Sequence, residues 1–397
     1  MKPFLSLTLV ILLLGLVVAP AAAEMKPVLA RPVSIDGKYA DGVKPLTPLG
    51  QWAVDQAKKL GVKLTGKTVE YVLTVTEETI DLAGVEFPVW AFGKEGEKGT
   101  VPGPTIGAVE GDLVRVTLKN KSRNNHTIHM HGPLTIRYDM DGVPGVAQEP
   151  VRPDEQFTYE FVAYPVGTHI YHCHVNANEH MDMGLYGPIV ILPRNPGADL
   201  PKGLEKIEQD VVLMLDEWDS TFSKEEGFKA TTAEQKQSAE VGHPRKIGNY
   251  NFFTINGNAF TDDRPTALLV KPGQKVRVRV INIGSWPHNM HFHGHNFLVT
   301  NVDGYPVRNP QRSDTINIIP GERMDLVFEA NQEGRWVWHC HIVSHATNDG
   351  VYHGGMLLVV VYPDGLDPKK FPLSKPTKIS EGGKSTLPAL AAQERKP

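Results

Sequence analysis

The histidines of this chain are concentrated in four short clusters, and their spacing constrains the fold more than any other feature. Thirteen of the sixteen histidines lie in 126-HTIHMHG-132, 169-HIYHCHV-175, 288-HNMHFHGH-295 and 338-WHCHIVSH-345, and both cysteines lie inside these clusters. Successive side chains of a β-strand point to opposite faces, so histidines two residues apart share one face. The pattern therefore predicts strands that each present two imidazoles on the same side.

Four such pairs can converge, and two of them enclose a cysteine. The pairs are His129 and His131, His172 and His174, His291 and His293, and His339 and His341. Cys173 and Cys340 have a histidine on both sides, so each thiolate points away from these neighbours and toward a different metal. One strand thus contributes to two sites, an eight-imidazole cluster and a separate thiolate centre.

Further histidines complete the thiolate centres. His126 and His288 precede the first paired histidine of their half by three residues, an odd offset that places them on the opposite face. His180 and His345 follow the cysteines by seven and five residues, close enough for a loop to fold back. The expected outcome is a His2Cys site in each half. A trigonal site of this kind is typical of blue, type 1 copper.

Copper explains these residues better than other metals do. Zinc needs four closed ligands, which would leave most of the histidines unexplained. Iron–sulfur sites use thiolates, and two cysteines among so many imidazoles favour copper. His169, His243 and His295 lie outside the pattern and are interpreted as packed or surface residues.

The motif HxHG followed by HCH, repeated in a second half, resembles the multicopper oxidases, specifically their two-domain, small laccase-like members. The resemblance spans roughly residues 70 to 365 and implies a type 1 copper motif in each of two cupredoxin domains. It implies one type 1 copper on His126, Cys173 and His180, and another on His288, Cys340 and His345. It also implies a trinuclear cluster, with type 2 copper on His129 and His291 and the type 3 pair on His131, His172, His174, His293, His339 and His341. About four to five coppers per chain are expected.

The axial positions of the two type 1 sites are inferred from the same resemblance. In the first half, the position where blue copper proteins often carry a methionine holds Leu185, with Met181 and Met183 as nearby alternatives. A non-coordinating leucine would raise the reduction potential. In the second half the corresponding loop is longer, and the equivalent position holds His353, with Met356 close behind.

An acid beside the cluster is also expected, because reduction of dioxygen to water consumes protons. The segment 137-RYDMDGVPGVAQEPVRP-153 resembles the laccase segment that carries such an acid. Asp141 is therefore the expected proton donor, and Asp139 is the fallback. Alternatively, Asp141 and Gly142 form only a turn, since this dipeptide is a strong turn signal.

The chain divides into segments with different expected roles. An apolar run before a small-residue end identifies 1–23 as a secretory signal peptide. The other segments are an N-terminal leader at 24–66 with a short helix near 51–60, a first domain at 67–195, a linker at 196–208, a second domain at 209–365 with a loop or partly helical insertion near 219–249, and an extended tail at 366–397. Short strands between Gly/Pro turns fit antiparallel sandwiches. The expected fold is all-β, with two cupredoxin-like Greek-key β-sandwich domains.

Location and partners follow from the same features. The signal peptide predicts an exported protein, periplasmic or secreted, without a membrane anchor. The formal net charge of -4 argues against nucleic acid as a partner. The two-domain resemblance implies a homotrimer, in which head-to-tail contacts close a ring and the clusters are shared between subunits.

Three functions from different classes are compatible with these ligands. A laccase-like oxidase would take single electrons from phenolic, aromatic or metal-ion reductants and pass them through Cys173 and Cys340 to dioxygen. A copper nitrite reductase is also a trimer of two cupredoxin domains, but it lacks the second cysteine and the trinuclear set. A non-enzymatic electron-transfer protein needs only one His2Cys site. The oxidase is favoured, and its reducing substrate is not identified by the sequence.

Overall fold

A computed structural model describes residues 27–221, 248–363, 365, 369–370 and 373–374. The expected signal peptide, most of the 219–249 insertion, His243 and nearly all of the tail lie outside these residues. The described residues are mostly strand, with helices α1 (Pro48–Lys59) and α2 (Ala177–Asp182) and two 3-10 turns, Tyr138–Met140 and Val343–Ala346. The all-β expectation is confirmed. Within the described ranges, no helix is both long and apolar enough to cross a membrane.

The first half is a sandwich of two sheets. Its strands are β3 (Lys38–Asp41), β4 (Lys67–Leu82), β5 (Val85–Lys94), β6 (Ile106–Val109), β7 (Leu113–Asn120), β8 (His129–His131), β9 (Gln156–Val162), β10 (Gly167–His172) and β11 (Tyr186–Leu192). One sheet has the order β3-β4-β7-β9, with β5 beside β4, and the other has the order β6-β11-β10-β8. The core between them includes Leu118, Phe161 and Cys173, so the thiol lies on the interior face.

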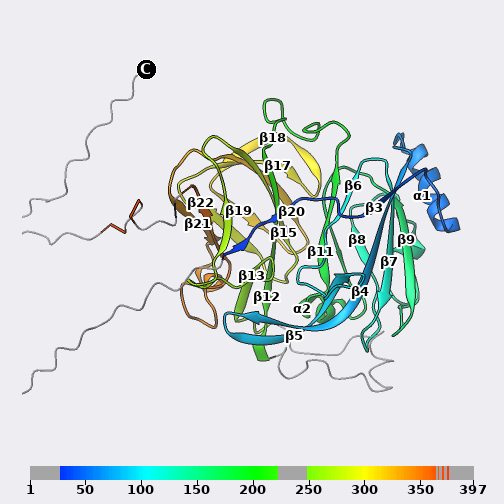
Figure 1. Cartoon of the computed structure of the whole chain (residues 1–397), viewed down its shortest axis with the longest axis horizontal. Coiled ribbons are helices and arrows are strands. Elements are labelled where there is room, and N and C mark those ends of the chain that lie inside the picture. Colours follow the sequence, from blue (N-terminus) through cyan, green and yellow to red (C-terminus); the bar gives the residue numbers. More distant parts are fainter. Residues whose placement is uncertain (1–26, 222–247, 364, 366–368, 371–372, 375–397) are drawn as a thin grey trace, which may run out of the picture.

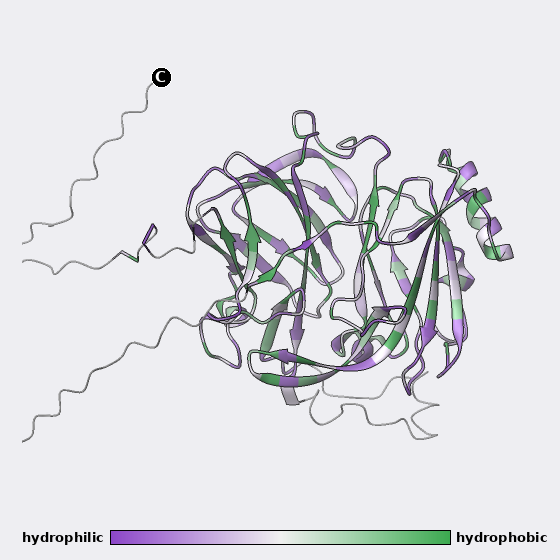
Figure 2. Cartoon of the chain, in the orientation of Figure 1, coloured by the Kyte–Doolittle hydropathy of each residue, from purple (hydrophilic) through white to green (hydrophobic). Residues whose placement is uncertain are grey.

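The second half repeats this plan with longer sheets. Its strands are β12 (Gln209–Trp218), β13 (Phe252–Ile255), β14 (Thr266–Leu269), β15 (Lys275–Asn282), β16 (His288–Phe292), β17 (Phe297–Val302), β18 (Tyr305–Ser313), β19 (Thr315–Ile318), β20 (Arg323–Glu329), β21 (Arg335–Cys340) and β22 (Leu357–Val361). The sheet orders are β14-β22-β21-β16-β19 and β13-β12-β15-β20-β17-β18. The two sandwiches lie side by side in Figure 1, and Figure 2 shows hydrophobic residues along the strands of both.

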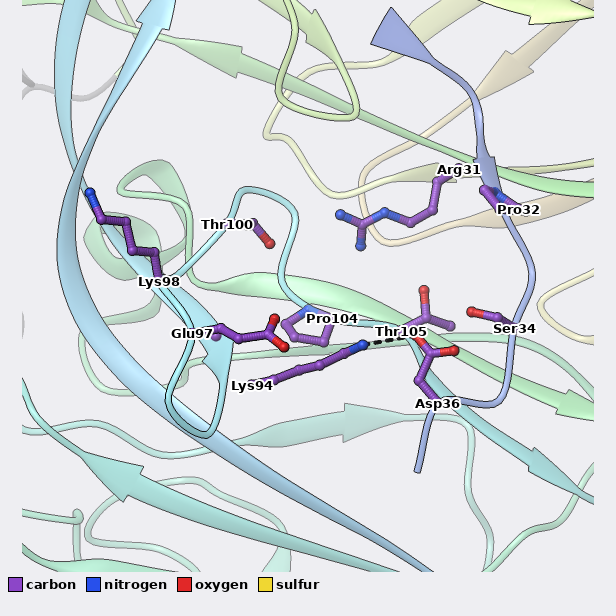
Figure 3. A pocket seen from close by; sticks show the side chains of 11 residues that line it. Arg31, Pro32, Ser34, Asp36, Lys94, Glu97, Lys98, Thr100, Pro104 and Thr105 are labelled. Atoms are coloured by element: carbon purple, nitrogen blue, oxygen red, sulfur yellow. Dashed lines mark hydrogen bonds and ion pairs between the residues drawn. The ribbon is translucent and has the colours of Figure 1, made fainter. Parts of the chain in front are cut away.

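The N-terminal segment joins the two halves. Strands β1 (Val28–Leu29) and β2 (Arg31–Pro32) extend the sheets of the second half by pairing with β14 and β12, whereas β3 pairs with β4 of the first half. The Arg31 guanidinium donates to the carbonyls of Pro102 and Gly103. It lines a pocket of about 290 Å³ beside the ion pair of Lys94 and Asp36 (Figure 3). The segment expected as a surface leader is therefore built into both sandwiches.

Buried contacts also connect the halves. At the hairpin of β4 and β5, the Phe87 ring packs edge-on against Trp218 and Phe252 of the second half, with centroids 6.0 and 5.3 Å away. Elsewhere the Arg279 guanidinium donates to the Thr168 hydroxyl of β10 and pairs with Asp325 of β20. Apolar packing and a satisfied buried charge thus fix the two sandwiches against each other.

Candidate metal centres

Strand register brings the histidine pairs of each half together. In the first half β8 pairs with β10 and places His129 opposite His172. In the second half β16 pairs with β21 and places His291 opposite His339. Because residues two apart share a face, each pairing assembles four imidazoles on one side of a sheet. The two halves repeat the same arrangement.

The four imidazoles of the first half form a compact group. Neighbouring rings of His129, His131, His172 and His174 have centroids 5.0 to 5.8 Å apart. The Nε2 atoms of His131 and His172 are 3.1 Å apart. Burial lowers the pKa of His131 to about 4 and that of His172 to about 3, so both rings are neutral at pH 7. Neutral imidazoles whose nitrogens face one another are suited to bind a metal.

The four imidazoles of the second half are arranged in the same way but are more exposed. Neighbouring rings of His291, His293, His339 and His341 have centroids 4.9 to 5.9 Å apart, and the Nε2 atoms of His293 and His339 are again 3.1 Å apart. His293 and His341 are exposed. Across the described ranges, each group of clustered metal-ligating side chains comes from a single half. Within these ranges the eight expected imidazoles thus lie in two separate groups of four, one in each half.

A buried thiol faces two imidazoles in the first half. The Cys173 Sγ is 3.2 Å from the Nδ1 of His180, which helix α2 supplies, and 3.6 Å from the Nδ1 of His126. The Trp90 ring packs on His180 with centroids 4.6 Å apart. Burial raises the pKa of the Cys173 thiol to about 11 and lowers the pKa of His126 well below its usual range. This is the donor set of a His2Cys centre closed off from water.

The second half contains the corresponding centre. The Cys340 Sγ is 3.6 Å from the Nδ1 of His345 and 3.9 Å from the Nδ1 of His288, and these two nitrogens are 3.1 Å apart. Burial raises the pKa of the Cys340 thiol to about 11 and lowers that of His345 to about 4. Three donor atoms therefore converge, and the low pKa of His345 leaves that ring neutral at pH 7.

Leu185 lies beside the first-half centre. Its N–H donates to the carbonyl of His180, and its carbonyl accepts from the N–H of Cys173. The side chain is fully buried, with 0% exposure. Met183 is also buried, but Met181 is only partly buried in α2. Leu185 is thus hydrogen-bonded through its backbone to both the cysteine and one of the histidines that face it.

Met356, and not His353, has these contacts in the second half. The Met356 N–H donates to the carbonyl of His345, and its carbonyl accepts from the N–H of Cys340. His353 is exposed. The preceding loop folds into an additional turn, in which the Gly354 N–H donates to the Ala346 carbonyl. Because of this turn, counting residues along the loop predicted His353 instead of Met356. The equivalent of Leu185 is thus Met356, which corrects the placement of His353.

The sequence did not reveal which residues orient the histidines of the thiolate centres. In the first half the Ser122 Oγ is 2.7 Å from the Nε2 of His126. In the second half the His288 Nε2 donates to the Glu217 carboxylate over 3.1 Å, and Glu217 is only 1% exposed. These partners leave Nδ1 of each ring free to face the sulfur. Neither residue belongs to a sequence motif. Glu217 is distant in sequence from His288, and no characteristic spacing relates Ser122 to His126.

Asp141 contacts the first-half imidazole group. The His129 Nδ1 donates to its carbonyl over 2.6 Å, and its carboxylate is 3.3 Å away. Asp139 pairs instead with an arginine. In the second half the His291 Nδ1 lies 3.2 Å from the carbonyl of Asp314, a residue that the sequence analysis did not single out. In the first half an aspartate carbonyl thus accepts from the imidazole, whereas in the second half the Thr315 hydroxyl is the nearer partner of His291, with its Oγ1 2.9 Å from Nδ1.

Comparison with models of protein families shows which proteins this chain is related to. Two models, both described as multicopper oxidase, match residues 74–196 and 228–363, together more than half of the chain. The chain belongs to the multicopper oxidase family. Membership implies copper as the cofactor, and the two buried thiolate–imidazole sets of this multicopper oxidase have the donor chemistry that copper prefers.

Individual relatives agree with this multicopper oxidase assignment. Laccase-3 of Thanatephorus cucumeris is 34% identical over 68% of this chain and 46% of its own length. The chain thus spans about half the length of the curated relatives it matches. The solved blue copper oxidase of Nitrosomonas europaea is 35% identical, with a TM-score of 0.64 over 74% of this chain and 86% of that one. A copper nitrite reductase of that organism, at 24% identity and a TM-score of 0.57, shares the fold.

Proposed function

We propose that this multicopper oxidase couples one-electron oxidation of a small reductant to the reduction of dioxygen to water. One observation carries the proposal: in each half a buried cysteine sulfur faces two imidazoles and is flanked in sequence by histidines of a four-imidazole group. Copper, when bound, supplies the one-electron chemistry. The protein supplies a dry site for electron entry and a separate site for oxygen.

The backbone gives a short covalent route between the two kinds of site. The Cys173 side chain points into the core, whereas those of His172 and His174 point to the imidazole group. Cys340 is placed in the same way between His339 and His341. An electron that arrives at either sulfur is therefore one residue away from the ligands of the oxygen site.

The ligand geometry supports a specific copper assignment. We propose type 1 copper on His126, Cys173 and His180 and on His288, Cys340 and His345, type 2 copper on His129 and His291, and a type 3 pair on His131, His172, His174, His293, His339 and His341. The close Nε2 atoms of His131 and His172, and of His293 and His339, support their role at the type 3 pair. Asp141 is the proposed proton donor, because its carboxylate lies beside His129.

A homotrimer would complete the oxygen site. The four-imidazole group of the second half is partly open to solvent, and its described neighbours include no histidine of the first half close enough to share a metal. A head-to-tail contact between chains would bring the two kinds of group together, and three such contacts can close a ring. Dioxygen would then be reduced at the subunit boundaries.

The reductant and location remain those expected from the sequence. We propose a phenolic, aromatic or metal-ion reductant for a protein exported to the periplasm or the exterior. A nitrite reductase shares the fold, but its mononuclear site would leave most of the imidazoles without a role. A simple electron carrier would need only one of the two thiolate centres.

Oxygen consumption tests the proposal directly. Copper-loaded protein should consume dioxygen with a phenol or with Fe(II) as reductant, and the Cys173→Ser, Cys340→Ser double variant should not. Nitrite under anaerobic conditions should give no product. Nitrite reduction without oxygen consumption would contradict the oxidase and support the reductase.

A further inference from the structure

The two thiolate centres of one chain are connected through the interface between its halves. We propose that Tyr250 and Trp286 form a bridge that carries one electron from the second-half centre to the first-half centre. This inference rests on the proposed function, because it requires copper at both Cys173 and Cys340. The bridge would act inside a single chain, separately from the route between each cysteine and its flanking histidines.

The first part of the bridge joins helix α2 to Tyr250. Helix α2 carries His180, a proposed copper ligand, and ends at Asp182. The Tyr250 hydroxyl donates to the Asp182 carboxylate over 3.2 Å. Tyr250 and Asp182 are 8% and 7% exposed, so this hydrogen bond is shielded from bulk water. A hydrogen bond and one short peptide segment thus separate the Tyr250 ring from a ligand of the first centre.

The second part runs through aromatic rings to the other centre. The Tyr250 ring meets Trp286 edge-on, with centroids 5.1 Å apart. Trp286 in turn stacks on His345, at a centroid distance of 5.5 Å and an interplanar angle of 29°. The Nδ1 of His345 is 3.6 Å from the Cys340 Sγ. Aromatic contact is therefore continuous from the interface to the second sulfur ligand.

A hydrogen-bonded chain runs parallel to this aromatic path. The Leu185 carbonyl accepts from Cys173, and the next residue, Tyr186, donates its hydroxyl to Asp216 over 2.7 Å. Asp216 precedes Glu217, which accepts from the Nε2 of His288. Tyr186, Asp216 and Glu217 are all buried. Two independent series of contacts thus link the same two centres.

Differences between the centres set the direction of transfer. The first centre has an apolar neighbour, Leu185, and its His126 contacts the neutral hydroxyl of Ser122. The second has Met356 in the backbone position of Leu185, and its histidine contacts a carboxylate. A carboxylate on a ligand and a weak axial sulfur both favour the oxidised metal. The second centre therefore has the lower potential and donates the electron.

The exchange balances without another reactant. The second-half centre loses one electron, the first-half centre gains it, and no proton needs to move. In the proposed ring, the two centres of a chain lie beside different oxygen sites. A bridge inside each chain would let electrons entering at one centre reach either site.

Single-centre variants provide the reference signals for the test. Copper-loaded Cys173→Ser and Cys340→Ser proteins should each retain one blue absorption band and one type 1 EPR signal, which identify the two centres. If either variant loses all blue copper or if the intact protein has one blue copper per chain, the two-centre form of the proposed function fails and the bridge fails with it.

Flash reduction of the intact trimeric protein then tests the bridge. With substoichiometric viologen radical under anaerobic conditions, the blue absorption of the second-half centre should bleach first. It should then recover while the blue absorption of the first-half centre bleaches by a matching amount. Transfer to the imidazole cluster would restore the second-half signal without bleaching the first. The exchange rate should be independent of protein concentration, because the path lies within one chain.

Matched variants identify the residues that carry the electron. Trp286→Leu should slow the exchange about tenfold, equivalent to about 1.4 kcal/mol in activation free energy. Trp336→Leu, which removes a partly buried indole elsewhere in the same half, should leave it unchanged. Tyr250→Phe keeps the ring and should slow it less than Trp286→Leu, with Tyr362→Phe as control. The bridge is overturned if two intact blue centres do not exchange an electron. It is also overturned if Trp286→Leu and Tyr250→Phe exchange it as fast as the unsubstituted protein.

Discussion

Leu185 and Met356 occupy the same backbone position beside the cysteines of the two halves. Each donates its N–H to the carbonyl of a histidine that faces the sulfur, and each accepts from the cysteine N–H. Both side chains are fully buried. Each thiolate centre thus has one sulfur and two imidazoles, and the residue at this backbone position is a leucine in one half and a methionine in the other.

This difference predicts opposite shifts in potential on exchange of the two side chains. Met356→Leu should raise the potential of the second-half centre, and Leu185→Met should lower that of the first. The expected shift is on the order of 60 mV, which corresponds to a tenfold change in relative stability for a one-electron couple. Spectroelectrochemical titration of the single-centre proteins measures it. A shift in the same direction for both exchanges would contradict the equivalence of the two positions.

The sequence predicted the donor groups because strand periodicity is local. Alternation alone placed His129 with His131 and turned Cys173 to the opposite face, and the structure has both features. The family and the two-sandwich fold are likewise confirmed. Glu217 was missed because its contact with His288 depends on how distant strands pack. The ligand roles themselves stay predictions, as do the trimer and the segment boundaries.

The raised thiol pKa values predict proton release on copper loading. Burial holds Cys173 and Cys340 in the protonated form at neutral pH, whereas the copper ligand is the thiolate. Each centre should therefore release one proton, and its copper affinity should rise about tenfold per pH unit below the thiol pKa. A pH indicator in weakly buffered solution measures the protons released during titration with Cu(II). The Cys173→Ser protein should release one proton fewer, and an unchanged count would argue against thiolate binding.

Asp141→Asn tests the proposed proton donor. The exchange keeps the backbone carbonyl that accepts from His129 but removes the ionisable group beside it. Oxygen consumption should fall about 100-fold, in the range of a lost general acid, while the blue absorption is retained. Asp139→Asn serves as the matched control, since that carboxylate pairs with Arg137. If both variants keep full oxygen consumption, Asp141 is only a turn residue.

The buried ion-pair network of Arg279 predicts a large contribution to stability. Arg279→Leu would leave Asp210 and Asp325 without their main cation, and Asp325 is 1% exposed. The free energy of unfolding should fall by about 3 to 5 kcal/mol. Lys121→Leu, at an exposed pair with Asp154, should change it by less than about 1 kcal/mol. Urea denaturation distinguishes the two, and equal small effects would show that the buried network contributes little.

Copper counting combined with visible absorption and EPR tests the central claim most directly. Two thiolate centres and one shared cluster per chain predict about five coppers, two of them blue and one with a type 2 EPR signal. About four coppers with a single blue signal would remove one thiolate centre. A preparation that binds one zinc and no copper would contradict the account as a whole.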